Sequence, residues 1–189
     1  MLLRIWGSFS YAERNTKEAT GEPAKFLNRH NEKVTLDVGC GNKPRGNINV
    51  DLYRFSDDIV DGRILRTHAD VIASGEYLPF RERVFDTVLS SNAIEHVPKP
   101  ALFLRELIRV SRNYINVRVP HRFSRFARRK GHKNHFDRKW FAVQLANLGI
   151  DEDMTRIRPH FASLFNLPIG LSRVREIEVE IFVERVKNE

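Results

Sequence analysis

The sequence predicts an α/β protein with a doubly wound, mostly parallel sheet, and three observations support this fold class. Short apolar runs with strand patterning alternate along the chain with segments of helical spacing. The first such run, at 34–38, stops abruptly in Gly39-Cys40-Gly41, as a strand running into a turn does. Residues 176–183 alternate with a period of two, which favours an antiparallel closing hairpin over a fully covered parallel strand.

Length and composition bound the kind of protein. The chain has 189 residues, of which 41% are hydrophobic and 30% charged, and this is typical of one globular domain with a sizeable core. We expect a helical N-terminal extension over 1–32 and the main domain over 33–189. No apolar run approaches the roughly 18 residues of a membrane span.

Cysteine usage and the N-terminus favour a cytoplasmic location. Cys40 is the only cysteine, so no intrachain disulfide can form. Arg4 interrupts the apolar N-terminus, which makes a poor signal peptide. A reducing compartment is the simplest setting for such a chain.

The glycine turn and the strand after it indicate a nucleoside site. Gly39 and Gly41 have no Cβ, so a ligand can lie directly against the backbone there. The next strand, around 48–52, ends on Asp51, whose carboxylate suits the two hydroxyls of a ribose. The connection between the two strands is too short for a full helix, which predicts a tight crossing loop at 44–46.

The remaining elements follow in order. We expect an acidic loop at 57–62, a strand at 85–92, a helix at 101–110 that Pro98 and Pro100 introduce, a strand at 115–119 and a helix between the caps Asp137 and Gly149. Parallel α/β sheets bind ligands at the carboxyl ends of their strands. The residues expected at such ends are Gly39, Asp51, Asp70 and Asn92.

The last segment is predicted to bury one face only. Its apolar face consists of Ile177, Val179, Ile181 and Val183, and its other face carries Glu176, Glu178 and Glu180. We expect this glutamate face to be uncovered and to offer a contact surface for a partner.

An ordered set of motifs resembles the class I S-adenosylmethionine-dependent methyltransferases of the small, single-domain type. The motifs are L-D-V-G-C-G at 36–41, N-V-D at 49–51, A-D at 69–70, Y-L-P-F at 77–80, F-D-T-V-L-S-S-N-A-I-E-H-V at 85–97 and R-E-L-I-R-V at 105–110. They cover about residues 34 to 150. The resemblance implies a Rossmann-like, seven-stranded sheet and S-adenosyl-L-methionine as the cofactor.

The resemblance also implies roles for individual residues. It assigns Asp37, Gly39 and Gly41 to the methionine part of the cofactor, Asp51 to the ribose, Asp70 and Val71 to the adenine, and Ser91 or Asn92 to the sulfonium and the substrate side. Methyl transfer needs a base only when the acceptor must lose a proton.

No motif fixes such a base. The candidates are His96, beside Glu95 at the lip of the expected pocket, and His121, His132 and His135 in the segment after Pro120. His135 with Phe136 is also consistent with simple docking of that segment. His132-x-x-His135 suggests a metal pair, but zinc needs further ligands, so we expect no metal site.

The positive charge is concentrated in one segment. Residues 99–139 hold thirteen Lys and Arg residues but only two acidic ones, whereas the whole chain has a net charge of +8. Within it, the run 121–133 interleaves Phe123 and Phe126 with Arg122, Arg125, Arg128 and Arg129. This pattern indicates an anionic acceptor, such as a nucleic acid, a phosphorylated metabolite or an acidic lipid surface. A solvated basic face without a ligand is the alternative.

The function predicted from sequence is therefore methyl transfer from S-adenosylmethionine to an unidentified, small or anionic acceptor. One alternative is a non-catalytic S-adenosylmethionine-binding subunit that supports a partner enzyme. The other is a nicotinamide-dependent oxidoreductase. Against it, Asn42-Lys43 stands where a dinucleotide fingerprint needs a further glycine and a helix N-terminus.

Overall fold

The computed structural model describes residues 33–53, 55–60, 63–161 and 174–183. The predicted helical extension at 1–32 lies outside the described residues. None of the described helices has the length and apolar character needed to cross a membrane.

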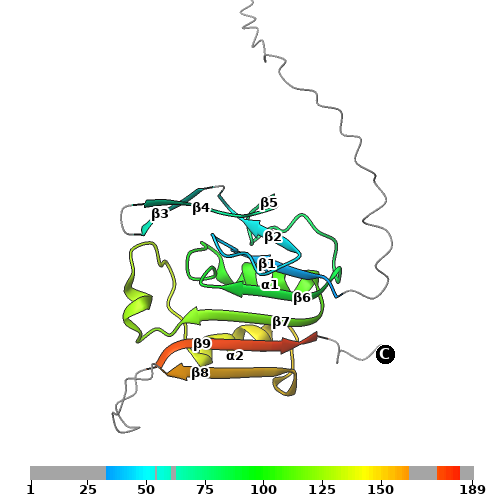
Figure 1. The fold of residues 1–189 in the computed structure, drawn as a ribbon. Coiled ribbons are helices and arrows are strands. Elements are labelled where there is room, and N and C mark those ends of the chain that lie inside the picture. The colour runs from blue at the N-terminus through cyan, green and yellow to red at the C-terminus, as the bar shows by residue number, and fades with distance from the viewer. Residues whose placement is uncertain (1–32, 54, 61–62, 162–173, 184–189) are drawn as a thin grey trace, which may run out of the picture. The chain divides into compact units, whose positions relative to one another are not determined.

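A sheet of seven strands organises the described part of the chain, in the order β5-β2-β1-β6-β7-β9-β8 (Figure 1). Its strands are β1 (Thr35–Val38), β2 (Ile48–Asp51), β5 (Val71–Ile72), β6 (Phe85–Ser91), β7 (Ser111–Pro120), β8 (Thr155–Phe161) and β9 (Val174–Phe182). The neighbours from β5 to β7 pair in parallel, whereas β9 is antiparallel to both β7 and β8. The predicted doubly wound, mostly parallel sheet with an antiparallel C-terminal hairpin is confirmed.

The connection from β1 to β2 is a tight loop without a helix, as predicted. The N–H groups of Gly39 and Cys40 both donate to the Val50 carbonyl, at 2.8 and 3.1 Å, and that of Asn47 donates to Thr35 at 2.8 Å. A Cβ on Gly46 would lie 2.5 Å from the Ile48 carbonyl oxygen. Only glycine allows the loop to pass so close to the strands.

Two α-helices of the described residues lie on the same side of the sheet (Figure 1). Helix α1 (Pro100–Val110) begins with proline, where the missing N–H has no intrahelical partner to lose, and buries Phe103, Leu104 and Leu107. Helix α2 (Arg138–Asn147) begins after Asp137, whose carboxylate accepts a hydrogen bond from the Trp140 N–H at 2.9 Å. Gly149 follows its end with φ of +74°. The sequence predicted both helices and both caps.

The acidic segment after β2 differs from its prediction. It forms a small antiparallel sheet of β3 (Phe55–Val60) and β4 (Arg63–Arg66), not a loop. The sequence between these strands is Asp-Gly, a dipeptide typical of hairpins. The prediction of a loop was wrong because it rested on the acidic composition of the segment, whereas the Asp-Gly dipeptide indicates a hairpin.

The expectation of an uncovered glutamate face on the last strand was also wrong. Strand β9 lies between β7 and β8, so its glutamates face side chains from both neighbours. Glu178 accepts hydrogen bonds from Asn116 at 2.9 Å and Arg118 at 2.7 Å, and pairs with His160 at 2.8 Å. The period-two pattern identified the faces of the strand but not its neighbours.

Candidate functional site

The two glycines of the turn after β1 serve different purposes. Gly39 has φ of +74°, and a Cβ there would overlap the Cβ of Ala93, in the segment that follows β6. Gly41 has φ of +56°, but no atom lies within 4 Å of the place where its Cβ would be. Gly39 therefore allows two segments to pack closely, whereas Gly41 borders open space in which a ligand fits against the backbone.

Asp51 lies at the carboxyl end of β2 and contacts this turn. Its Oδ2 accepts a hydrogen bond from the Gly41 N–H at 2.9 Å. Burial and, to a smaller extent, the negative charges of Asp51, Asp37 and Asp70 together raise the pKa of the neighbouring Cys40 thiol to about 12. The thiol therefore stays protonated near neutral pH, with three carboxylates close enough to act on it.

Asp37 is buried and paired with Arg45. Its Oδ1 lies 3.0 Å from Arg45 Nη2, and its Oδ2 accepts from the Arg45 backbone N–H at 3.0 Å. This pair attaches the tight loop to β1. The contact of Asp37 with the methionine part of a cofactor stays a prediction.

The sequence predicted that Asp70 lies at the carboxyl end of a strand, and the structure does not confirm this. It precedes β5, and its Oδ2 accepts from the backbone and side-chain nitrogens of Asn49, both at 2.8 Å. The carboxyl end of β5 is followed instead by Ala73 and Ser74, and the Ala73 N–H donates to the Asp51 carbonyl at 3.0 Å. A strand of only two residues gives little periodicity, so the sequence did not reveal where it ended. The adenine contacts of Asp70 and of the half-buried Val71 stay predictions.

The end of β6 carries a polar group without a partner and a strained residue. Ser91 Oγ is buried and has no hydrogen-bond partner among the described residues. Asn92 follows with φ of +53°, a left-handed conformation that few residues other than glycine adopt, and its N–H donates to the Arg118 carbonyl at 2.9 Å. Such strain is often kept at binding sites, where it aims a side chain.

The segment after Asn92 meets the basic segment. The N–H groups of Lys133 and Asn134 donate to the Glu95 carbonyl at 2.8 and 3.2 Å, and Asn134 Nδ2 donates to the Val97 carbonyl at 2.8 Å. These bonds bring the ring of His132 to that of His96, edge to face, with centroids 4.7 Å apart.

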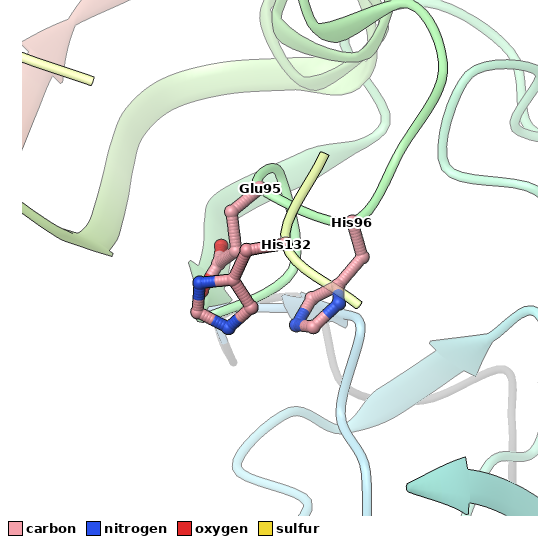
Figure 2. Close-up of side chains that lie close together, drawn as sticks. All are labelled: Glu95, His96 and His132. Carbon is pink, nitrogen blue, oxygen red and sulfur yellow. The ribbon is translucent and has the colours of Figure 1, made fainter. Parts of the chain in front are cut away.

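Glu95 completes this group, as Figure 2 shows. Its side chain is buried, with the residue 1% exposed, and neither carboxylate oxygen has a hydrogen-bond partner among the described residues. Burial raises the pKa of Glu95 to about 8, its own backbone N–H opposes the rise, and Glu176 adds to it. The sequence suggested Glu95 and His96 as neighbours, but not that His132 joins them.

The four histidines proposed from sequence as bases do not lie in one group. His96 contacts His132, whereas the exposed His135 lines an open cavity with Arg122, Asp137 and Trp140. His121 is half-buried. Burial lowers its pKa, Asp137 opposes this and Arg122 adds to it.

The basic segment presents both stacked and exposed cations. It contains one short 3-10 helix, η2 (Arg125–Arg128), whose N-cap is Ser124. The Phe126 ring is contacted by the guanidinium groups of Arg125, Arg129 and Arg175, at 4.8–5.0 Å from its centroid. Phe123 is 72% exposed, and Arg128 is also exposed.

Arg122 is less available than the other arginines of this segment. Its Nη1 lies 2.9 Å from Asp137 Oδ2, an ion pair that holds the basic segment at the start of α2. The free positive charge is therefore concentrated around η2.

The fold and this geometry define an α/β protein whose candidate site lies at the carboxyl ends of β1, β2 and β6. Residues 36–114 match the model of a methyltransferase domain family. No curated protein sequence gives a significant match.

Solved structures give similar folds at low sequence identity. An S-adenosylmethionine-dependent methyltransferase from Archaeoglobus fulgidus is 16% identical with a TM-score of 0.57, over 79% of this chain and 86% of that one. One from Thermotoga maritima is 18% identical with a TM-score of 0.56, over 80% and 83% of the two chains. A candidate methyltransferase of Haloferax volcanii, in complex with the Trm112 methyltransferase activator, is 12% identical with a TM-score of 0.55, over 80% and 82%.

The matched domain over residues 36–114 and the fold both support a class I S-adenosylmethionine-dependent methyltransferase. The implied cofactor is S-adenosylmethionine. The residues present fit such a group: Gly41 borders open space, Asp51 lies beside it, and the unpartnered Ser91 hydroxyl ends a strand of the same sheet edge.

Proposed function

We propose that this protein transfers a methyl group from S-adenosylmethionine to an anionic acceptor that the basic segment admits. The observation that carries the proposal is the open space beside Gly41, which Asp51 borders at the end of the adjacent strand. When bound, S-adenosylmethionine supplies a methyl group on a sulfonium centre, and the protein's task is to align the acceptor with it.

Several residues are proposed to hold the cofactor. Asp51 accepts hydrogen bonds from ribose hydroxyls, and Gly39 and Gly41, with Asp37 behind them, form the wall along the methionine part. Asp70 and Val71 are kept as candidates for the adenine, with Ser74 as a further one because it follows β5. Ser91 and Asn92 face the acceptor side.

The acceptor side is proposed to recognise negative charge. Arg125 and Arg129 are held on Phe126, so their guanidinium groups are oriented in advance, and Arg128 is exposed next to them. This arrangement suits phosphate or carboxylate groups on a small molecule or a nucleic acid. The chain's single cysteine suits a reducing, cytoplasmic setting.

The geometry of the loop after the glycine turn disfavours a nicotinamide cofactor. Residues 39–47 contain no helix, so no helix N-terminus follows the glycine turn to bind a pyrophosphate. Calorimetric titration with S-adenosylmethionine, S-adenosylhomocysteine and NADH tests this directly. We expect micromolar binding of the two sulfur ligands and none of NADH; the reverse would replace the proposed function.

A non-catalytic subunit is the second candidate, and it is less favoured. Its proposed contact surface was the glutamate face of β9, but Glu178 and Glu180 pair with Arg118 and Arg158 inside the sheet. The activator complex of the Haloferax volcanii protein is the observation that keeps this candidate. A partner that co-purifies with the protein, together with cofactor binding but no methyl transfer to any acceptor, would favour it.

A further inference from the structure

We infer that Glu95, His96 and His132 form a binding site for one divalent transition-metal cation on the acceptor side of the sheet. The ligand atoms of the three side chains all lie within 4.8 Å of one another (Figure 2). This inference reverses the expectation of no metal that the sequence gave. His135, the partner suggested by sequence spacing, does not belong to the group.

The state of Glu95 is the first argument. A carboxylate with the residue 1% exposed and with no hydrogen-bond partner among the described residues has lost its water without gaining a donor. Buried charges are expected to be paired or to coordinate a metal.

Pre-organisation is the second argument. His132 comes from a segment far along the chain from Glu95, yet Lys133 and Asn134 hydrogen-bond to the Glu95 carbonyl, and the Asn134 side chain bonds to Val97. These backbone contacts fix the approach of the two segments independently of any bound ion. A site whose ligands are already gathered loses little conformational entropy when a cation binds.

The donor set indicates the kind of cation. Two imidazoles and one carboxylate suit Zn²⁺, Mn²⁺, Fe²⁺ or Co²⁺, whereas Ca²⁺ and Mg²⁺ prefer oxygen ligands. Bonds of about 2.0–2.1 Å in a tetrahedron place ligand atoms roughly 3.4 Å apart. The side chains would therefore close by up to about 1.4 Å, which χ rotations of the two half-buried imidazoles can supply.

The position of the site suggests what the cation does. Gly39 packs against Ala93, two residues before Glu95, so the site adjoins the glycine turn. Three protein ligands leave coordination positions open for oxygen atoms of an acceptor, such as hydroxyl or phosphate oxygens. This role rests on the proposed function, whereas the cation site itself does not.

The test uses the full-length protein after a chelator has removed any bound metal. The protein is titrated with Co²⁺, whose visible absorption reports nitrogen and oxygen ligands. Zn²⁺ is then added to displace the Co²⁺. We expect one equivalent of Co²⁺ with a visible band. His96→Ala and His132→Ala should each weaken binding at least tenfold, and Glu95→Gln should do so while keeping the size of the side chain. His135→Ala and His121→Ala are matched controls and should bind as wild type.

Two results would overturn the site. One is the absence of Co²⁺ and Zn²⁺ uptake by the folded wild-type protein, which leaves Glu95 as a protonated buried acid. The other is equal cation binding by the wild type and by His96→Ala, a half-buried position whose variant should fold. Circular dichroism checks folding, and binding of S-adenosylhomocysteine by each variant is measured separately. A folded wild-type protein that binds S-adenosylhomocysteine but no cation therefore rejects this inference alone, and one that binds a cation but no S-adenosylhomocysteine rejects the proposed function alone.

Discussion

The proposed cofactor side and the proposed acceptor side of this domain are built in different ways. The glycine turn, the tight loop and Asp51 come from one continuous stretch, and backbone hydrogen bonds to Val50 and Thr35 hold them together. The acceptor side joins 91–97 to 121–136 through contacts between distant segments, and it leaves cations exposed around η2. The first region is specified by backbone conformation and the second by charge and long-range pairing.

The largest effect should come from the backbone of the cofactor side. Gly39→Ala combines a positive φ with overlap against Ala93, and we expect it to destabilise the fold by about 3 kcal/mol. Gly41→Ala carries the conformational cost alone, about 1 kcal/mol, but its methyl group enters the open space and should weaken S-adenosylhomocysteine binding. Urea denaturation and calorimetry of both variants measure this. Equal losses of stability would contradict the different roles given to the two glycines.

The sheet next to the acceptor side should respond to acid. Burial opposes ionisation of Glu178, but hydrogen bonds from Asn116, Arg118 and His160 outweigh it and lower its pKa from 4.5 to about 2. Because the folded pKa lies below the unfolded one, the stabilisation is complete above pH 4.5 and is lost as the pH falls towards about 2.

The expected loss across that window is about 2 to 3 kcal/mol. Urea midpoints between about pH 5 and pH 2.5 measure it. Glu178→Gln should be less stable at the upper end and should show a flatter pH dependence than the wild type. A slope in that variant as steep as in the wild type would assign the acid sensitivity to other carboxylates.

A substitution of Asp51 tests the proposed cofactor side through a side chain and leaves the backbone conformation unchanged. Asp51→Ala removes charge-assisted hydrogen bonds to the ribose and should weaken S-adenosylmethionine binding by about 2 kcal/mol. Asp86→Ala is the matched control. Asp86 lies at the start of β6, where it accepts from Val34 and pairs with Arg112, so its loss should lower stability and leave cofactor affinity unchanged. Unchanged affinity in Asp51→Ala would remove Asp51 from the site.

The same contrast explains what the sequence could and could not predict. The glycine turn, Asp51 and the caps of α2 are local features, in which residue type and spacing determine the backbone directly. The group of Glu95, His96 and His132 depends on how 132–134 docks on 95–97, and no local pattern encodes that pairing. Asp70 was misplaced because β5 is too short to show periodicity, and the glutamates of β9 were misread because alternation does not reveal which strands lie on either side.

The smallest effect on binding per substituted residue should come from the exposed cations of the proposed acceptor side. Arg128→Ala combined with Arg129→Ala removes two positive charges from η2 and its edge, and with them one guanidinium stacked on Phe126. Binding of S-adenosylhomocysteine should stay unchanged, because these groups belong to the acceptor side. Affinity for an anionic probe, a short single-stranded oligonucleotide, should fall by about 1 kcal/mol per charge at low salt, with a shallower salt dependence.

Arg81→Ala combined with Arg105→Ala is the matched control, since both side chains are exposed and lie outside the run 121–133. It removes the same net charge. If the oligonucleotide is held only by general electrostatic attraction, its affinity should fall equally in both double variants. A loss confined to Arg128 and Arg129 assigns the anion to η2. A loss of cofactor binding in that double variant would instead show that the basic segment supports the cofactor side, and the two regions would not be independent.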